Sequence, residues 1–488
     1  MITPLSAKDA TVLRDFLLRA GFTDSEFQRR PTLRELPAKH AGNWPLLVDY
    51  TKEPTFLNTL LRLFLFGMTL DQRTVSSVLP PEVINILLQS GLLRPVGETW
   101  QPMCMLSPLD TFWFAADPVG RMQSDLAGDM VLWANPTTRI LHQLSIRKPV
   151  ESVLDLGAGC GVLSVLAAAN GKKIVASDIN ERAQMFTEFN ASLNGVTNIE
   201  WRTGDTFEPV GDQTFDLILA NPPFFVTPSE TKLYCENSME LDMYCRRVVR
   251  EGAAHLKESG YLQMTLEWVQ IEGQSWQERV SEWVEGTSCD AWIIRSYTGD
   301  LANYAFERMK DELISHPEQA EEKFNSWLDY YRKHKVEQIC GGVLMLRRRS
   351  GKNWLRIEEC PLELREPFGQ SVEDVFATQT LLSRHPDDEE LMQSKPRLAS
   401  GVRLDQQFQL QDGHWTQASL QMKFERGLPG SINLEFAVAD FLATCGGDRS
   451  LREIVKELSL RVNASEPEIG KQCCGVVRRL AERRFLAL

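Results

Sequence analysis

The feature that most constrains the fold of this 488-residue chain is an apolar stretch that runs into a cluster of glycines. Val153 to Leu156 has the pattern of a short buried strand, Gly157 to Gly161 carries three glycines, and Val162 to Asn170 has a helical pattern. Glycine lets a backbone approach a ligand closely, and the N-terminus of a helix favours polar or anionic groups. This order predicts a nucleotide-binding turn between a strand and a helix.

Three later segments place polar side chains where further predicted strands end. Ile174 to Asp178 is a predicted strand that ends in an acid, whose carboxylate can accept hydrogen bonds from a ribose diol. Asp205 follows a predicted strand that ends at Arg202. The tetrad Asn221 to Phe224 follows the strand Leu217 to Ala220. Ligands of open α/β sheets bind outside the carboxyl ends of the strands, so the four features predict one site.

These motifs, in this order and spacing, resemble the class I S-adenosylmethionine-dependent methyltransferases, and among them the small-domain amino methyltransferases with an Asn-Pro-Pro-(Phe/Tyr) motif. The resemblance covers about residues 125 to 350. It implies an α/β fold with a Rossmann-like sheet of seven strands, S-adenosyl-L-methionine as the cofactor, and no metal. The implied cofactor-binding residues are Asp155, Gly157 and Gly159 at the methionine end, Gly161, Asp178 at the ribose, Asp205 at the adenine amine, and Asn221.

The tetrad Asn221, Pro222, Pro223 and Phe224 is the predicted catalytic group. An amide or an exocyclic base amine is a poor nucleophile because its lone pair is delocalised. The side-chain carbonyl of Asn221 and the backbone carbonyl of Pro222 can accept hydrogen bonds from the N–H groups of such an amine or amide, which favours a pyramidal nitrogen. Proline stiffens the turn, and Phe224 can stack on a planar substrate. The alternative is a Pro-Pro strand terminator followed by a core phenylalanine.

Composition limits the class of protein. Hydrophobic residues make up 43% and charged residues 24%, as in an ordinary soluble globular protein, and the length suits about three domains. Ten scattered cysteines without zinc-ligand spacing predict reduced thiols in the cytoplasm. Met1 to Ala20 lacks a signal core, and Leu60 to Leu70 is too short to span a bilayer, so no membrane is expected. The net charge of −13 gives no overall attraction to nucleic acid.

Three domains are predicted. Residues 1–120 form an N-terminal helical module with a hairpin from Leu92 to Trp113, an order typical of winged-helix proteins. Residues 121–355 form the methyltransferase domain with a helical insertion at 304–336, and residues 356–488 form a β-ribbon and a second winged-helix-like module. The candidate reading helix, Pro81 to Ser90, carries no lysine or arginine, which favours a structural or substrate-positioning role.

The leading hypothesis for function is methylation of an exocyclic amine of a nucleic-acid base, in RNA rather than DNA. It depends on Phe224 as a stacking platform and on local basic patches, including Arg347-Arg348-Arg349 at an expected hairpin tip and Tyr330 to Lys335. The alternative is methylation of a glutamine side-chain amide in a protein, because the same geometry suits an amide and an acidic chain favours a basic partner. The oligomeric state is not specified by the sequence.

Two other classes are less well supported. A binding module without chemistry does not explain why Asp155, Asp178, Asp205 and Asn221 are all present. A nicotinamide-dependent dehydrogenase has a third glycine where this chain has Leu163, and it has no use for an Asn-Pro-Pro-Phe motif.

Overall fold

The computed structural model describes residues 2–29, 44–118, 127–228, 232–315, 317–364, 366–384 and 387–488. The chain divides into two compact units. The first comprises Met1–Leu141, Pro149–Thr287 and Thr298–Gly341, and the second comprises His142–Lys148, Ser288–Tyr297 and Gly342–Leu488. The predicted three-domain division stays a prediction. Within the described residues, no helix is long and apolar enough to cross a membrane.

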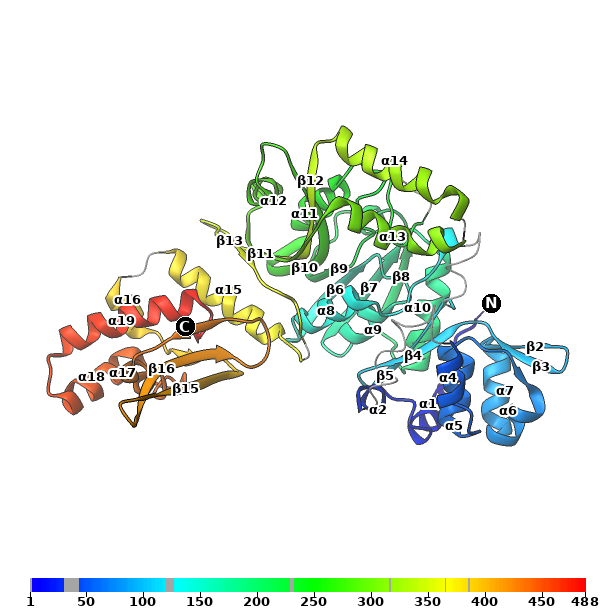
Figure 1. Ribbon diagram of the computed structural model, residues 1–488, viewed down its shortest axis with the longest axis horizontal. Helices are drawn as coiled ribbons and strands as arrows, with labels where there is room; N and C mark the ends of the chain where they lie inside the picture. Colours follow the sequence, from blue (N-terminus) through cyan, green and yellow to red (C-terminus); the bar gives the residue numbers. More distant parts are fainter. Residues whose placement is uncertain are drawn as a thin grey trace. The chain divides into compact units, whose positions relative to one another are not determined.

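The central feature is an eight-stranded sheet with the order β13-β11-β12-β10-β9-β6-β7-β8 (Figure 1). The bounds are β6 Val150–Leu156, β7 Gly171–Asp178, β8 Ile199–Thr203, β9 Phe215–Ala220, β10 Leu256–Ile271, β11 Cys289–Gly299, β12 Val336–Arg348 and β13 Leu355–Glu359. Strands β8, β7, β6, β9 and β10, in this spatial order, pair in parallel with one another, which confirms the α/β fold class. The resemblance implies seven strands, and β13, parallel to β11, is an eighth.

Helices alternate with the strands around the site. Their bounds are α8 Pro136–Leu144, α9 Val162–Ala167, α10 Glu181–Leu193, α11 Met243–Ala254 and α12 Trp276–Val284. Helices α9 and α10 pack near β6, β7 and β8, while α11 and α12 pack on β10. The middle strands are largely buried, with mostly apolar side chains, as expected for a sheet covered on both faces. Polar side chains collect at both ends of these strands: Ser152, Asp216 and Lys257 hydrogen-bond one another at the amino ends, and Asp178, Asp205 and Asn221 lie at the carboxyl ends.

The N-terminal part of the first unit is built from short helices and two hairpins. The helices are α1 Ala7–Arg19, α2 Asp24–Arg29, α4 Trp44–Tyr50, α5 Phe56–Leu60, the π-helix η2 Leu61–Leu65, α6 Gln72–Val78 and α7 Pro81–Gln89. The expected single hairpin is in fact two, β2 Leu93–Val96 with β3 Thr99–Pro102, and β4 Met105–Leu109 with β5 Phe112–Ala116. Asp110, with a φ of 52°, allows the second tight turn. The winged-helix assignment stays a prediction.

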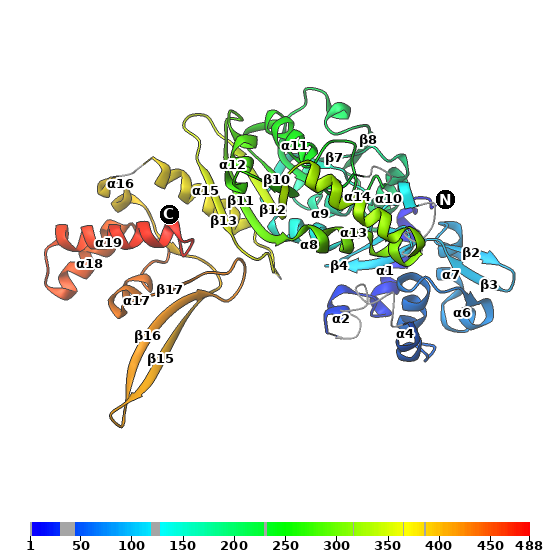
Figure 2. The ribbon, with the colours of Figure 1, turned by 45° about the horizontal axis from the view of Figure 1, so that its top comes forward.

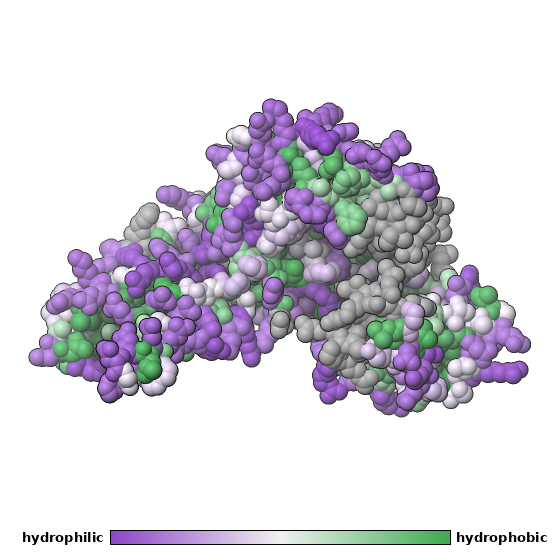
Figure 3. Space-filling model, in the orientation of Figure 1, coloured by the Kyte–Doolittle hydropathy of each residue, from purple (hydrophilic) through white to green (hydrophobic). Residues whose placement is uncertain are grey.

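The helical insertion is a pair of packed helices, α13 Leu301–Ser315 and α14 Ala320–Lys333, which run side by side in Figures 1 and 2. Its inner face forms a core in which Trp327 and Tyr331 are buried against Val226 and Ile339. The outward side of α14 is mainly hydrophilic (Figure 3). Because Tyr331 is fully buried, it cannot stack on RNA, and it packs with the buried Trp327 in this core instead.

The second unit contains helices besides the predicted β-ribbon and helical module. Two of them, α15 Gly369–Ser383 and α16 Asp388–Gln393, precede the ribbon in the chain. The ribbon itself, β15 Val402–Gln411 and β16 His414–Phe424, projects from the helices of this unit (Figure 2). The remaining elements are β14 Arg397–Leu398, β17 Ser431–Asn433, α17 Phe436–Leu442, α18 Leu451–Val462, α19 Glu466–Glu482 and β18 Leu486–Ala487. Ser450 forms a capping box with Glu453 at the start of α18.

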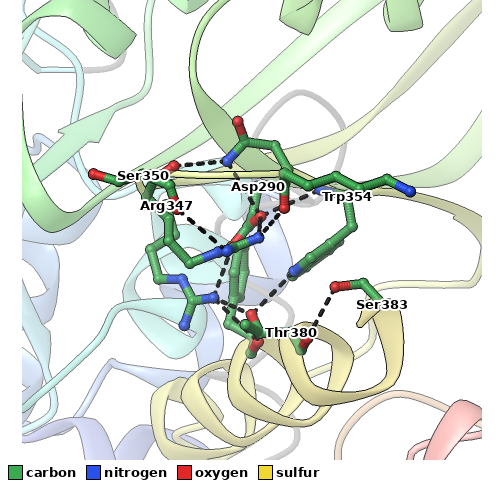
Figure 4. A network of polar contacts seen from close by, with 10 residues as sticks. Asp290, Arg347, Ser350, Trp354, Thr380 and Ser383 are labelled. Carbon is green, nitrogen blue, oxygen red and sulfur yellow. Dashed lines mark hydrogen bonds and ion pairs between the residues drawn. The ribbon is translucent and has the colours of Figure 1, made fainter. Parts of the chain in front are cut away.

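Arg347 to Arg349 were expected to offer free positive charge for RNA at a hairpin tip. This expectation is wrong for Arg347 and Arg349, because both are paired within the second unit. Asp290 is fully buried, and its carboxylate accepts hydrogen bonds of 2.7 Å from Arg347 and of 2.7 and 2.8 Å from Arg349 (Figure 4). Burial raises the pKa of Asp290, but the hydrogen bonds from Arg349 and Arg347 outweigh this and hold it below its ordinary value. Two of the three charges counted for RNA binding are therefore structural.

Candidate active site

A cavity opens at the carboxyl ends of β6, β7, β8 and β9 in the first unit. It is partly open to solvent, and the empty space among its lining residues, open solvent included, is about 950 Å³. Six of the residues predicted from the sequence line it, namely Gly157, Gly159, Asp178, Asp205, Asn221 and Pro223. Residues distant in the chain complete the wall, namely Trp133, Asn135, Thr138, Ile179, Tyr234 and Tyr244.

The three glycines of the turn play different structural parts. Gly157 and Gly159 have φ values of +72° and +55°, and a Cβ atom at either position would meet nothing within 4 Å. Their open sides leave room for a ligand close to the backbone. A Cβ atom on Gly161 would lie 2.8 Å from the side chain of Thr187 on α10, and Gly161 does not line the cavity. Gly161 is thus required for packing between the turn and α10.

Asp178 ties the end of β7 to the glycine turn. Its Oδ2 atom accepts a hydrogen bond of 2.8 Å from the backbone amide of Gly159, and its Oδ1 atom accepts one of 2.9 Å from the amide of Asn180. Burial raises the pKa of Asp178, while these backbone hydrogen bonds oppose the rise. Each carboxylate oxygen has a further lone pair, so the group can still accept hydrogen bonds from a diol. Next to it, Ile179 leaves 54% of its surface exposed in the cavity wall.

Asp155 lies beneath the turn and does not line the cavity. It is 1% exposed, and Ser164 on α9 donates a hydrogen bond of 2.6 Å to its Oδ2 atom. Burial raises the pKa of Asp155 to about 7. Its Oδ1 atom has no hydrogen-bond partner among the described residues, and neither do the hydroxyls of Ser177 and Thr206, which line the cavity. Buried polar groups are normally paired, so the two hydroxyls in the cavity wall fit a site built for a polar ligand.

Asp205 is held by an ion pair that the sequence did not indicate. Arg247 on α11 donates a hydrogen bond of 2.8 Å to Asp205 Oδ2 and another of 2.8 Å to Glu251. Arg247 thus fixes the acid at the cavity wall. The other oxygen of Asp205 stays available to accept a hydrogen bond from a ligand amine.

The amide of Asn221 is held at both ends. Its Nδ2 atom donates a hydrogen bond of 3.0 Å to the hydroxyl of Thr138 on α8, and its Oδ1 atom accepts one of 2.6 Å from the hydroxyl of Thr265 on β10. Pro223 lines the cavity, whereas Pro222 is buried and Phe224 is partly buried beside it. The structure therefore brings Asn221 and Pro223 to the cavity wall, with Pro222 and Phe224 next to them.

The segment after the tetrad is anchored to the inserted helices. The backbone amide of Val226 donates to the hydroxyl of Tyr304, and the hydroxyl of Tyr331 donates to the carbonyl of Val226 at 2.8 Å. The guanidinium of Arg308 lies 4.0 Å from the centre of the Phe225 ring. Asn237 also donates a hydrogen bond of 2.8 Å to the carbonyl of Pro223. The insertion thus fixes the backbone that leaves the tetrad.

Thr138 and Thr265 are site residues that the sequence analysis missed. The available signal for Thr265 is that β10 places Gln263, Thr265 and Glu267 at every second position, all buried. Polar residues that alternate in an otherwise apolar strand mark a face with polar partners. No comparable signal marks Thr138, because its partner lies 83 positions away in the chain.

A mostly parallel sheet with a glycine turn, an acid after the second core strand and an Asn-Pro-Pro-Phe tetrad at one cavity defines a class I methyltransferase domain, whose members use S-adenosylmethionine as methyl donor. Residues 135–272 match the family model described as the methyltransferase small domain.

Two glutamine methyltransferases are similar in sequence to part of this chain. A putative protein N5-glutamine methyltransferase of Methanocaldococcus jannaschii is 36% identical over 121 residues, 23% of this chain and 60% of that protein. The release factor glutamine methyltransferase of Aquifex aeolicus is 29% identical over 187 residues, 35% of this chain and 64% of that protein. The chain thus spans less than two thirds of these two relatives.

Among solved structures, a ribosomal protein L11 methylase from Lactobacillus delbrueckii subsp. bulgaricus is similar, with 19% sequence identity and a TM-score of 0.26. The likeness covers 44% of this chain and 78% of the methylase.

Proposed function

We propose that this chain is an S-adenosylmethionine-dependent N-methyltransferase whose acceptor is the side-chain amide of a glutamine in a protein. The observation that carries the proposal is the amide of Asn221, which is fixed in the wall of a cavity whose other walls are the glycine turn and Asp178. When bound, S-adenosylmethionine supplies an electrophilic methyl group. The residues that fit it are Gly157 and Gly159 beside the methionine end, Asp178 at the ribose, and Asp205 at the adenine amine.

The chain's own residues supply positioning and electrostatic stabilisation. The Oδ1 atom of Asn221 can accept a hydrogen bond from an N–H group of the acceptor, which favours a pyramidal nitrogen whose lone pair points at the methyl group. Positive charge that develops on this nitrogen is stabilised by the same oxygen, which is held in place before the reaction. No residue needs to act as a nucleophile. The cavity therefore suits transfer to a planar nitrogen.

The choice of a protein acceptor is supported by the names of the two relatives, both of which are described as glutamine methyltransferases. The net charge of −13 also favours a basic protein over RNA. The first hypothesis, an RNA base amine, loses part of its support because Arg347 and Arg349 are paired with Asp290 and Tyr331 is buried. Phe224 remains compatible with either planar acceptor.

The test is methyl transfer from labelled S-adenosylmethionine into the protein and RNA fractions of one cell extract, with Asn221→Ala as the matched control. We expect label in protein, and mass spectrometry should find it on a glutamine side-chain nitrogen. Label that appears in RNA alone would replace the protein acceptor with a base amine. A lack of Asn221-dependent label in both fractions would refute N-methyl transfer.

A further inference from the structure

The amide of Asn221 belongs to a chain of hydrogen bonds that begins at the N-terminus of α8. There the Oδ1 atom of Asn135 accepts hydrogen bonds from the backbone amide of Thr138 at 2.9 Å and from the hydroxyls of Thr137 and Thr138 at 2.7 and 2.9 Å. A hydroxyl has a single proton to donate. Because Thr138 donates its proton to Asn135, it can only accept a hydrogen bond from Asn221.

This fixed direction selects one of the two orientations of the Asn221 amide. In the observed orientation, Nδ2 donates to Thr138 and Oδ1 accepts from Thr265. Rotation of the amide by a half-turn would place Oδ1 against the oxygen of Thr138, and Thr138 could keep this hydrogen bond only by turning its proton away from Asn135. The hydroxyl of Thr265 adds to the same preference by donating to Oδ1.

Both threonines are largely shielded from solvent. Thr138 is 8% exposed and Thr265 is 2% exposed, so water cannot easily replace their hydroxyls. Thr265 is brought to Asn221 by the register of β10 against β9, in which Met264 pairs with Ala220. The residues that follow this pair, Thr265 in β10 and Asn221 directly after β9, therefore lie next to each other at the cavity.

We infer that Thr138 and Thr265 are positioning residues, which hold the Asn221 amide so that its carbonyl oxygen, rather than its NH₂ group, faces the methyl acceptor. This inference rests on the proposed function of Asn221 as an acceptor of the substrate N–H bond. An oxygen with two lone pairs can accept from Thr265 and from the substrate at once. A rotated amide would instead offer a donor to the substrate N–H and would block the reaction.

The kinetic test compares Thr265→Val, which keeps the shape and removes the hydroxyl, with Thr265→Ser, which keeps the hydroxyl. We expect Thr265→Val to lower kcat about 10-fold, the effect of losing one orienting hydrogen bond. KM for the acceptor and Kd for S-adenosylmethionine should stay near their wild-type values, and Thr265→Ser should restore kcat. Thr138→Val should act like Thr265→Val, so it carries the test if Thr265→Val does not fold in a thermal-melt control.

A binding test keeps the inference separate from the proposed function. Sinefungin, a cofactor analogue, carries a protonated amine where the cofactor carries its methyl group, and this amine is a probe for a correctly oriented acceptor oxygen. We expect Thr265→Val and Thr138→Val to bind sinefungin several-fold more weakly but S-adenosylhomocysteine unchanged. If the wild-type protein methylates nothing, the proposed function fails, and these titrations still test the orientation.

Two results would overturn the positioning role. One is an unchanged kcat together with unchanged sinefungin affinity in both valine variants. The other is an equal loss of affinity for sinefungin and S-adenosylhomocysteine, because a general disturbance of the cavity would then explain the data. A Thr265→Ser variant with a kcat as low as that of Thr265→Val would also show that the hydroxyl does not orient the Asn221 amide.

Discussion

The Oδ2 atom of Asp178 lies 2.8 Å from the backbone nitrogen of Gly159, so the acid at the end of β7 is joined to the glycine turn after β6. This hydrogen bond couples two motifs that the sequence presents as separate. A change at Asp178 therefore affects both a candidate ribose contact and the shape of the turn that would hold the methionine end.

Replacement of Asp178 by alanine should weaken the binding of S-adenosylmethionine by about 30- to 150-fold, because hydrogen bonds to a charged group are worth about 2–3 kcal/mol. Isothermal titration calorimetry measures this directly. Asp178→Asn, which keeps an acceptor for the Gly159 amide, is the control and should lose less affinity. An unchanged affinity in Asp178→Ala would refute the ribose contact and would mean that Asp178 only stabilises the turn.

Truncation of Asn221 to alanine should lower kcat by about two to three powers of ten, the usual cost of removing a preorganised group that acts in the transition state. KM for the acceptor should change far less. Calorimetry should show nearly normal S-adenosylmethionine binding, because the tetrad faces the acceptor. Asn221→Asp, which keeps an acceptor oxygen, should retain more activity than alanine. Near-normal turnover of Asn221→Ala would rule out the proposed role of this amide.

The buried carboxyl of Asp155 should make stability depend on pH. Burial raises its pKa from an ordinary 3.8 to about 7, so between these values the folded chain keeps a proton that the unfolded chain releases. Its contribution to stability is therefore complete below pH 3.8 and is lost as pH rises to 7, at about 1.4 kcal/mol per pH unit.

Asp155→Asn removes this titration and is the direct comparison. The difference in unfolding free energy between the two proteins, measured by urea denaturation from pH 4 to 8, should change up to about pH 7 and then level off. Parallel pH profiles for wild type and variant would contradict the raised pKa.

The buried pairs of Asp290 with Arg347 and Arg349 should matter for stability. Asp290→Ala leaves two largely buried guanidinium groups without their carboxylate, and such a loss typically costs about 3–5 kcal/mol. The pair of Asp329 and Arg332, with side chains 71% and 67% exposed, provides the control. Asp329→Ala should cost no more than about 1 kcal/mol in the same urea experiment. Equal effects of the two substitutions would mean that burial does not strengthen the dependence on Asp290.

The sequence alone was sufficient for the features that depend on short-range patterns. Apolar runs that end in polar residues predicted β6, β7 and β9 and the edge at which the cavity lies, because residues at the ends of parallel strands must meet there. The capping box of Ser450 and Glu453 is encoded locally in the same way, since both partners lie within one helical turn.

Longer-range relationships could not be read in this way. From the sequence, Arg347 and Arg349 were predicted to be available for RNA, because no residue near them in the chain indicates their partner. That partner, Asp290, lies 57 and 59 residues away. The glycine pattern likewise did not distinguish Gly161, which faces Thr187, from Gly157, which faces open space.

What the sequence by itself determined about this protein is thus the class of fold, the cofactor expected and the motifs around the cavity. The orientation of Asn221 was decided only by the tertiary structure. Thr138 and Thr265 reach this amide across 83 and 44 residues of chain, and they do so because α8 and the register of β10 on β9 bring them there. A hydrogen bond between distant residues depends on that packing, and no local pattern of residue types encodes it.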